Sequence, residues 1–291
     1  MLRLALPKGS LERATLALFE DADLAVVRSS DRDYRATIAD PRIAEVRILR
    51  PQEIPRYVAK GYFDLGITGR DWIEESGAEV VSLTQLHYSK ATARPVRIVV
   101  AVPSDSAVEA VKDLKAGTRV STEFPALTQR FFDSHRIDVD VQLSYGATEA
   151  KVPDIVDAIV ELTETGSSLR AAGMKIIDTI LVSHTELVAN KDAYAEAAKR
   201  HAMEQIGTLL LGTLEARGKV LVKLNVAEDK LDAVVAMLPA LKSPTVSKLS
   251  GDGGYAVETV VPKAQINTLI PALKDHGATD IIELPIAKIV H

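Results

Sequence analysis

The sequence contains no cysteine among its 291 residues. This absence excludes disulfide bonds, cysteine-ligated zinc and a thiol nucleophile. Aromatic residues make up only 4% of the chain, against 47% hydrophobic residues in all, so alanine, valine, leucine and isoleucine must build the cores. No apolar run reaches the ~18 residues that a spanning helix needs, and Pro7 interrupts the apolar start too early for a signal peptide. We therefore expect a cytoplasmic protein with no membrane partner.

An excess of positive charge is also missing. Thirty-five basic residues stand against 40 acidic ones, which leaves a formal net charge of −5 and disfavours a nucleic-acid partner. An anionic ligand would have to be captured locally, by a few basic side chains and by backbone amides. The six histidines are scattered without a metal-binding spacing, so we expect no dedicated transition-metal site.

Apolar strands that feed turns and then helices recur through the first two thirds of the chain. Examples are Leu2–Leu6, Asp64–Thr68 and Val139–Leu143. This order predicts an α/β core of two lobes, of the periplasmic-binding-protein-like kind, with a ligand held in the cleft between them. We expect residues 1–92 with 184–217 to form lobe I and residues 93–183 to form lobe II. An alanine-rich helix over residues 192–217 would lead out of the core.

Residues 218–291 read as a separate module. The strand-like alternation of Lys219–Val226 is followed by a helical stretch, two strands, a second helical stretch and a last strand. The order βαββαβ is that of a ferredoxin-like fold. No group of residues suited to catalysis falls in this part of the chain, so we expect a regulatory domain.

The segment Asp157–Leu169 carries the strongest chemical signal. An apolar stretch with two acidic residues, Asp157 and Glu161, runs into Thr165-Gly166-Ser167-Ser168. Glycine permits close approach of the backbone, and successive N–H groups with three hydroxyls suit a phosphate. The acidic residues could accept hydrogen bonds from ribose hydroxyls. The plain alternative is an acidic strand followed by an ordinary helix cap.

Two further turns lie at the ends of predicted strands. Lys8-Gly9-Ser10 follows the first strand, with Ser10 as the expected cap of the next helix, and Gly69-Arg70-Asp71 follows the strand Asp64–Thr68. In open α/β sheets such turns bind ligands. Each could equally be a plain connection between a strand and a helix.

Taken together, these motifs resemble the long form of ATP phosphoribosyltransferase, the family that opens histidine biosynthesis. The resemblance covers the whole chain in order. It is carried by Leu6–Gly9, Asp64–Trp72, Gly146–Lys151 with Pro153, Asp157–Leu169, and a C-terminal module with Ser243-Pro244-Thr245. It implies transfer of the phosphoribosyl group of 5-phosphoribosyl 1-pyrophosphate (PRPP) to N1 of ATP, with release of pyrophosphate. Such a reaction needs positioning and charge stabilisation rather than a covalent nucleophile or an acid–base residue, and we assign none.

The resemblance also implies roles for individual residues. Thr165, Gly166, Ser167 and Ser168 would bind the 5′-phosphate of PRPP, and Asp157 and Glu161 its ribose hydroxyls, although many members of the family have Asp where Glu161 stands. Lys8, Gly9, Gly69, Arg70 and Asp71 would lie around the other phosphates and ATP. The cofactor would be Mg²⁺, held mainly by substrate. L-Histidine would inhibit by binding the C-terminal module at Asn225, Ser243 and Thr245, in a homo-oligomer of dimers or hexamers without a separate regulatory subunit.

Two alternatives stay open on the residues alone. One is a cytoplasmic two-lobe solute-binding or regulatory protein that does no chemistry. The other is a phosphoribosyltransferase with a different base acceptor, since only the resemblance points to ATP.

Overall fold

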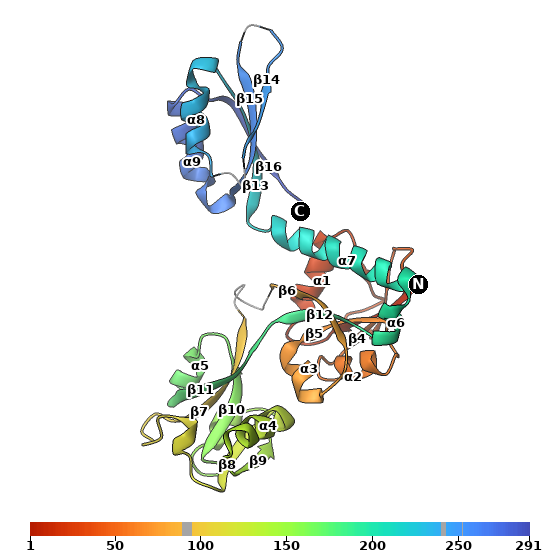
Figure 1. The fold of residues 1–291 in the computed structure, drawn as a ribbon, viewed down its shortest axis with the longest axis vertical. Coiled ribbons are helices and arrows are strands. Elements are labelled where there is room, and N and C mark those ends of the chain that lie inside the picture. The colour runs from red at the N-terminus through yellow and green to blue at the C-terminus, as the bar shows by residue number, and fades with distance from the viewer. Residues whose placement is uncertain (89–94, 240–242, 252) are drawn as a thin grey trace. The chain divides into compact units, whose positions relative to one another are not determined.

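The first of two units, Met1–Gly207, carries two mixed sheets, and the second, Thr208–His291, carries one (Figure 1). The structure is a computed structural model, and it describes residues 1–88, 95–239, 243–251 and 253–291. Within these residues no helix is both long and apolar enough to cross a membrane.

Lobe I is built on a seven-stranded sheet in which β1 pairs in parallel with both β4 and β5. Its order is β2 (Val26–Val27), β3 (Arg35–Ile38), β4 (Ile43–Leu49), β1 (Leu2–Pro7), β5 (Leu65–Gly69), β12 (Thr185–Ala189) and β6 (Val81–Leu86). Helices α1 (Glu12–Asp21), α2 (Ile54–Ala59) and α3 (Arg70–Ser76) each follow a parallel strand of this sheet. Every residue of β5 is buried, as expected of a central parallel strand.

Lobe II is built on a five-stranded sheet in which β8, β9 and β10 run parallel. Its order is β11 (Met174–Ser183), β7 (Val96–Pro103), β10 (Ala158–Thr163), β8 (Thr118–Thr122) and β9 (Val139–Leu143). Valine and isoleucine of β7 and β10 pack with Phe124 and Phe132 of the α4 region (α4, Pro125–His135) on one face. On the other face, Leu169 of α5 (Ser167–Ala171) belongs to a second core cluster with residues of β7 and β10.

The chain passes between the lobes twice. It leaves lobe I after β6 and enters lobe II at β7, and it returns through β11 directly into β12, with His184 between them. The strands on either side of the two crossings are paired with each other: β6 with β12 in the lobe I sheet, and β7 with β11 in the lobe II sheet. The predicted two-lobe α/β core is confirmed. The exact lobe boundaries stay predictions, and the boundary between residues 92 and 93 lies outside the described residues.

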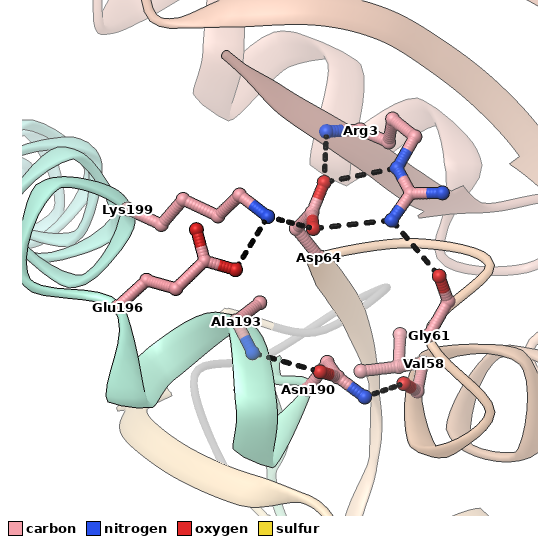
Figure 2. A network of polar contacts seen from close by, with 8 residues as sticks. All are labelled: Arg3, Val58, Gly61, Asp64, Asn190, Ala193, Glu196 and Lys199. Atoms are coloured by element: carbon pink, nitrogen blue, oxygen red, sulfur yellow. Dashed lines mark hydrogen bonds and ion pairs between the residues drawn. The ribbon is translucent and has the colours of Figure 1, made fainter.

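Helices α6 (Lys191–Ala195) and α7 (Ala197–Ala216) are held to lobe I by a polar network at the amino ends of β1 and β5 (Figure 2). The buried Asp64 carboxylate accepts hydrogen bonds from the backbone and guanidinium of Arg3 at 2.8–3.2 Å, and Lys199 Nζ lies 3.4 Å from it. Asn190 caps α6 by accepting from the Ala193 N–H at 2.9 Å.

The second unit has the element order β13 (Lys219–Val226), α8 (Leu231–Met237), β14 (Thr245–Lys248), β15 (Tyr255–Pro262), α9 (Ile266–Asp275) and β16 (Thr279–Pro285). The sheet order β14-β15-β13-β16 is antiparallel throughout, as in a ferredoxin-like fold. Both helices lie on one face, where Val234 and Leu273 pack on alternate residues of β13 (Figure 1). The predicted βαββαβ module is confirmed.

Two local predictions are wrong. The helix expected over residues 192–217 is two helices, broken at Glu196, whose extended ψ of 114° ends α6. Ser10 does not cap α1, because the helix starts two residues later with Leu11 as its N-cap and no side-chain cap. No strand was predicted where β2, β3 and β6 lie. Of these, β2 and β6 are the two edge strands of the lobe I sheet.

Candidate functional site

The predicted ligand turns of lobe I lie at one edge of its sheet. Strands β1, β4 and β5 run parallel and end at Pro7, Leu49 and Gly69. The carboxyl ends of parallel strands share an edge, so the turns that follow them are neighbours. In lobe II the carboxyl ends of β8, β9 and β10 meet in the same way, which places the Thr165–Ser168 loop beside the turns after Thr122 and Leu143.

A cavity opens where these two edges and the crossing segments meet. Lobe I contributes Gly69, Asp71 and Trp72 to its wall, and lobe II contributes Leu162 and Glu164. The remaining wall comes mostly from the crossing segments, including His87, Tyr88, Ser183 and His184. The His87 and His184 rings meet edge to face with centroids 5.4 Å apart. A pocket with apolar walls and a few converging polar groups is the usual form of a small-molecule site.

Asp71 is the buried acid of this cavity. Its carboxylate accepts a hydrogen bond from Ser183 Oγ at 2.9 Å, and its backbone N–H donates to the same hydroxyl at 3.1 Å. Burial raises the pKa of Asp71, and the hydrogen bonds from Ser183 and from the Trp72 backbone oppose that shift without cancelling it. The residues are 112 positions apart, so this contact ties α3 of lobe I to the end of β11.

Gly69 makes room for this carboxylate. A Cβ atom added at Gly69 would lie 2.0 Å from Asp71 Oδ1, closer than any real contact. The φ of Gly69 is −83°, a value open to every residue, so the requirement for glycine here is steric rather than conformational.

The loop Thr165-Gly166-Ser167-Ser168 is ordered by its own hydroxyls. The Gly166 N–H donates to Thr163 Oγ1 at 2.8 Å, and the Thr165 and Ser167 hydroxyls are 2.9 Å apart. Gly166 has a φ of +74°, which favours glycine, and a Cβ there would come within 2.9 Å of the Arg170 guanidinium. The loop follows Glu164, which lines the cavity. The assignment of these four residues to a phosphate stays a prediction.

Glu161 lies on β10 with its carboxylate half buried near the same edge. Burial raises the pKa of Glu161, and the nearby carboxylates of Glu123 and Glu149 add to that shift, while hydrogen bonds from Leu162 and Thr148 oppose it. Close by, Lys151 Nζ donates to Ser144 Oγ at 2.6 Å rather than pairing with Glu149. Glu161 thus has polar and acidic neighbours, and its assignment to sugar hydroxyls stays a prediction.

Asp157 is not brought to this edge. It immediately precedes Ala158, the first residue of β10, and it is paired with Arg119 at 2.7 Å. The six residues of β10 separate it from the Thr165–Ser168 loop by about 20 Å. Arg119 holds the pKa of Asp157 below its ordinary value, as expected of an ion pair at the amino edge of the sheet. The structure therefore separates Asp157 from the other residues predicted for PRPP.

The predicted basic residues of lobe I are all paired. Lys8 Nζ lies 3.9 Å from Glu12 and 4.9 Å from the centre of the Tyr34 ring. Arg70 is 2.5 Å from Glu74 and 3.8 Å from the buried Glu186. Among the five lobe I residues predicted for ATP and phosphates, Gly69 and Asp71 line the cavity; Lys8, Gly9 and Arg70 lie in the turns beside it.

Of the three residues predicted for an effector, Asn225 and Thr245 lie on one face of the sheet of the second unit, and Ser243 precedes β14. Thr245 pairs with Glu258 and Asn225 pairs with Ala256. Ala256 and Glu258 are two residues apart on β15, so all four lie on the same face of the sheet, the face away from the helices. Asn225 Nδ2 donates to Asp280 Oδ2 at 2.9 Å, and Ser243 and Thr245 are exposed. Their role in effector binding stays a prediction.

Several wall residues of the cavity were not predicted. Ser183 and His184 carry no motif, and only the fold brings them to Asp71. Trp72 did carry a signal, because it is the single tryptophan of the chain and follows Gly69-Arg70-Asp71 directly.

Comparison with known proteins shows which family the chain belongs to. A family model described as ATP phosphoribosyltransferase (HisG) matches residues 50–212, and one described as the HisG C-terminal domain matches residues 216–288. The chain is 47% identical over 289 residues to the ATP phosphoribosyltransferase of Pelotomaculum thermopropionicum, covering 99% of each chain. It is 48% identical over 290 residues to that of Solibacter usitatus, covering 100% of this chain and 99% of the relative.

A solved structure, the ATP phosphoribosyl transferase (HisG:HisZ) complex from Thermotoga maritima, is also similar. The match has a TM-score of 0.64 at 26% identity and covers 74% of this chain and 99% of that one. The full-length matches and both family models lead to one conclusion: the chain belongs to the ATP phosphoribosyltransferase family, in the form that carries the HisG C-terminal domain on the same polypeptide.

Proposed function

We propose that this protein works in the cytoplasm and joins N1 of ATP to C1′ of PRPP, releasing pyrophosphate as the first step of histidine biosynthesis. The observation that supports this most directly is that one cavity is lined by Gly69 and Asp71 of lobe I and by Glu164 of lobe II, the residue just before the Thr165–Ser168 loop. A two-substrate transfer needs such a site, because each lobe can position one substrate against the other.

The 5′-phosphate of PRPP would bind the Thr165–Ser168 loop. The hydroxyls of Thr165 and Ser167 and the tight turn at Gly166 support this assignment. Glu161 would accept hydrogen bonds from the ribose hydroxyls, because it is on the strand that leads into the loop. Asp157 is left out of the proposal, since it lies at the other end of that strand.

ATP and the pyrophosphate group would lie on the lobe I side, near Lys8, Gly9, Gly69, Arg70 and Asp71. Positive charge from Lys8 and Arg70 would stabilise the leaving pyrophosphate. The apolar walls with Trp72 and Tyr88 are suited to a purine base, whose faces stack on aromatic rings. No residue is asked to act as a nucleophile.

Mg²⁺ fits this arrangement as an ion carried by the substrate. The described residues hold no cluster of three or more histidine or carboxylate side chains suited to a metal ion. Mg²⁺ prefers substrate phosphates and water over a protein cage, so few protein ligands are needed. Its chemistry would be neutralisation of the pyrophosphate charge. Glu161, half buried on β10, would be a carboxylate on the PRPP side.

The second unit would be the histidine-sensing domain. Asn225, Ser243 and Thr245 would contact L-histidine on the sheet face that the helices leave open. Ile282 and Leu284 are exposed in that unit, at 50% and 39%, which supports burial against another subunit in dimers or hexamers. A regulatory domain within the chain would remove the need for a separate regulatory subunit.

One assay tests the proposed reaction. ATP, PRPP and Mg²⁺ are incubated with the purified protein and inorganic pyrophosphatase, and the ultraviolet absorbance of the product is followed. We expect absorbance to rise only when all components are present. Turnover with another base in place of ATP would favour a different phosphoribosyltransferase, and ligand binding without turnover would favour a solute-binding protein.

A further inference from the structure

The turn between β1 and α1 already holds an anion, the carboxylate of Glu12. Its Oε2 accepts a hydrogen bond from the Gly9 N–H at 3.2 Å and lies 3.9 Å from Lys8 Nζ. Its Oε1 accepts from Arg28 Nη1 at 2.8 Å. One carboxylate thus takes a backbone N–H and two cations, the donor set that a phosphate oxygen would use.

Cations outnumber this carboxylate. Arg28 is only 11% exposed and Lys8 23%, and Arg50 lies beside them, since a Cβ on Gly9 would be 3.8 Å from Arg50 Nη1. Asp31 also forms an ion pair with Arg28 at 3.5 Å. This pair is weak, because the Asp31 side chain is fully exposed to solvent. Asp33 also interacts with Arg28, but of these three carboxylates Glu12 is the one that joins Arg28 to the Gly9 N–H.

We propose that Glu12 is a placeholder for the substrate: its carboxylate occupies the Lys8–Gly9 turn and leaves when a diphosphate arrives. A diphosphate carries more negative charge than one carboxylate, so it can displace Glu12 from the same donors. The return of Glu12 would then help pyrophosphate leave. Glu12 is therefore a positioning residue that sets diphosphate affinity. This inference rests on the proposed function, which places phosphates at Lys8 and Gly9.

The test is calorimetric titration with inorganic pyrophosphate at fixed ionic strength, using the full chain. Glu12→Gln keeps the side-chain shape and removes the charge. Glu20→Gln, on an exposed position of the same helix, makes the same change in net charge away from the turn. We expect Glu12→Gln to bind pyrophosphate about fivefold more tightly, as loss of a competing ion pair predicts, and Glu20→Gln to match the parent. Pyrophosphate should also become a stronger product inhibitor of Glu12→Gln by a similar factor.

Lys8→Met separates this inference from the proposed site. If Lys8→Met weakens pyrophosphate binding but Glu12→Gln binds no more tightly than Glu20→Gln, Glu12 is only a structural contact of the turn and the inference is overturned. If Lys8→Met leaves the affinity of the parent unchanged, the assignment of phosphates to this turn fails as well. Thermal melting of each variant shows that it is folded, and Glu12→Ala serves as the second variant if Glu12→Gln is not.

Discussion

Gly69→Ala should damage the protein through Asp71 rather than through the backbone. The φ of −83° admits alanine, but the new Cβ would lie 2.0 Å from Asp71 Oδ1, so the buried carboxylate must rotate away. Rotation breaks the 2.9 Å hydrogen bond from Ser183 Oγ. It also pushes a charged group into the cavity that Gly69, Asp71 and Ser183 all line.

The magnitude follows from what the carboxylate loses. A hydrogen bond to a charged, buried group contributes about 1.5–3 kcal/mol. The rotated Asp71 carboxylate would also lose part of its other hydrogen bonding. We expect Gly69→Ala to lower the free energy of unfolding by about 2–3 kcal/mol. For a unit of this size that corresponds to a fall of about 4–12 °C in the melting temperature. The value of kcat/KM should fall at least about tenfold, because misplaced groups cost that much in a positioned site.

Calorimetric melting of Gly69→Ala, Ser183→Ala and the double variant isolates the cause. Since Gly69→Ala already breaks the Ser183 contact, adding Ser183→Ala should cost less than about 0.5 kcal/mol more. Gly207→Ala, in α7, is the control. Its Cβ would make an ordinary 3.6 Å contact with Leu187 Cδ2, so alanine should be neutral or stabilising there. Fully additive losses in the double variant would refute the proposed role of Gly69.

Three further variants test the charges and the second unit. Asp64→Asn should destabilise the protein by about 2 kcal/mol at neutral pH, because Arg3 and Lys199 lose their buried partner. Burial raises the pKa of Asp64, but Arg3 and Lys199 lower it by more, so the pKa in the folded protein lies below 3.8. The parent therefore loses this stabilisation as pH falls below about 4, and the difference in stability between the parent and Asp64→Asn should shrink in acid melts. Asp71 is the opposite case: its pKa is raised, so the parent loses stability as pH rises above 3.8. Asp71→Asn should therefore melt higher than the parent at neutral pH while losing activity, and a lower melting temperature there would contradict this. Ser243→Ala with Thr245→Ala, or truncation after Arg217, should weaken inhibition by L-histidine at least about tenfold in the turnover assay. Unchanged inhibition would place the effector site in the first unit.

Much of the fold follows from local patterns. The alternation in Lys219–Val226 predicts β13 to the residue, and Val139–Leu143 does the same for β9. Both are strands with regular burial or clear flanking turns. The edge strands β2 and β6 were missed because they carry no buried run, and Val26–Val27 is only two residues long.

The site was predictable only in part, for a different reason. Turns that follow strands are visible in a sequence, so Gly69-Arg70-Asp71 and Thr165–Ser168 could be identified. Contacts between distant segments are not visible, and Asp71 meets Ser183 across 112 positions. Asp157 was placed with Glu161 because both acids belong to one apolar stretch. Which of the two lies at the ligand edge depends on where the strand starts, and β10 starts at Ala158.

The most direct test of the proposed site is kcat/KM for PRPP in Gly166→Ala measured beside Gly173→Ala. The two glycines flank α5 with φ values of +74° and +73°, so alanine should cost each about 1 kcal/mol of backbone strain. Only at Gly166 would the new Cβ meet other atoms, 2.9 Å from Arg170 Nη1, inside the loop assigned to the 5′-phosphate. We expect Gly166→Ala to lose at least about tenfold in kcat/KM for PRPP and Gly173→Ala to stay within about twofold of the parent. Equal values in the two variants would contradict the assignment of the phosphate to this loop.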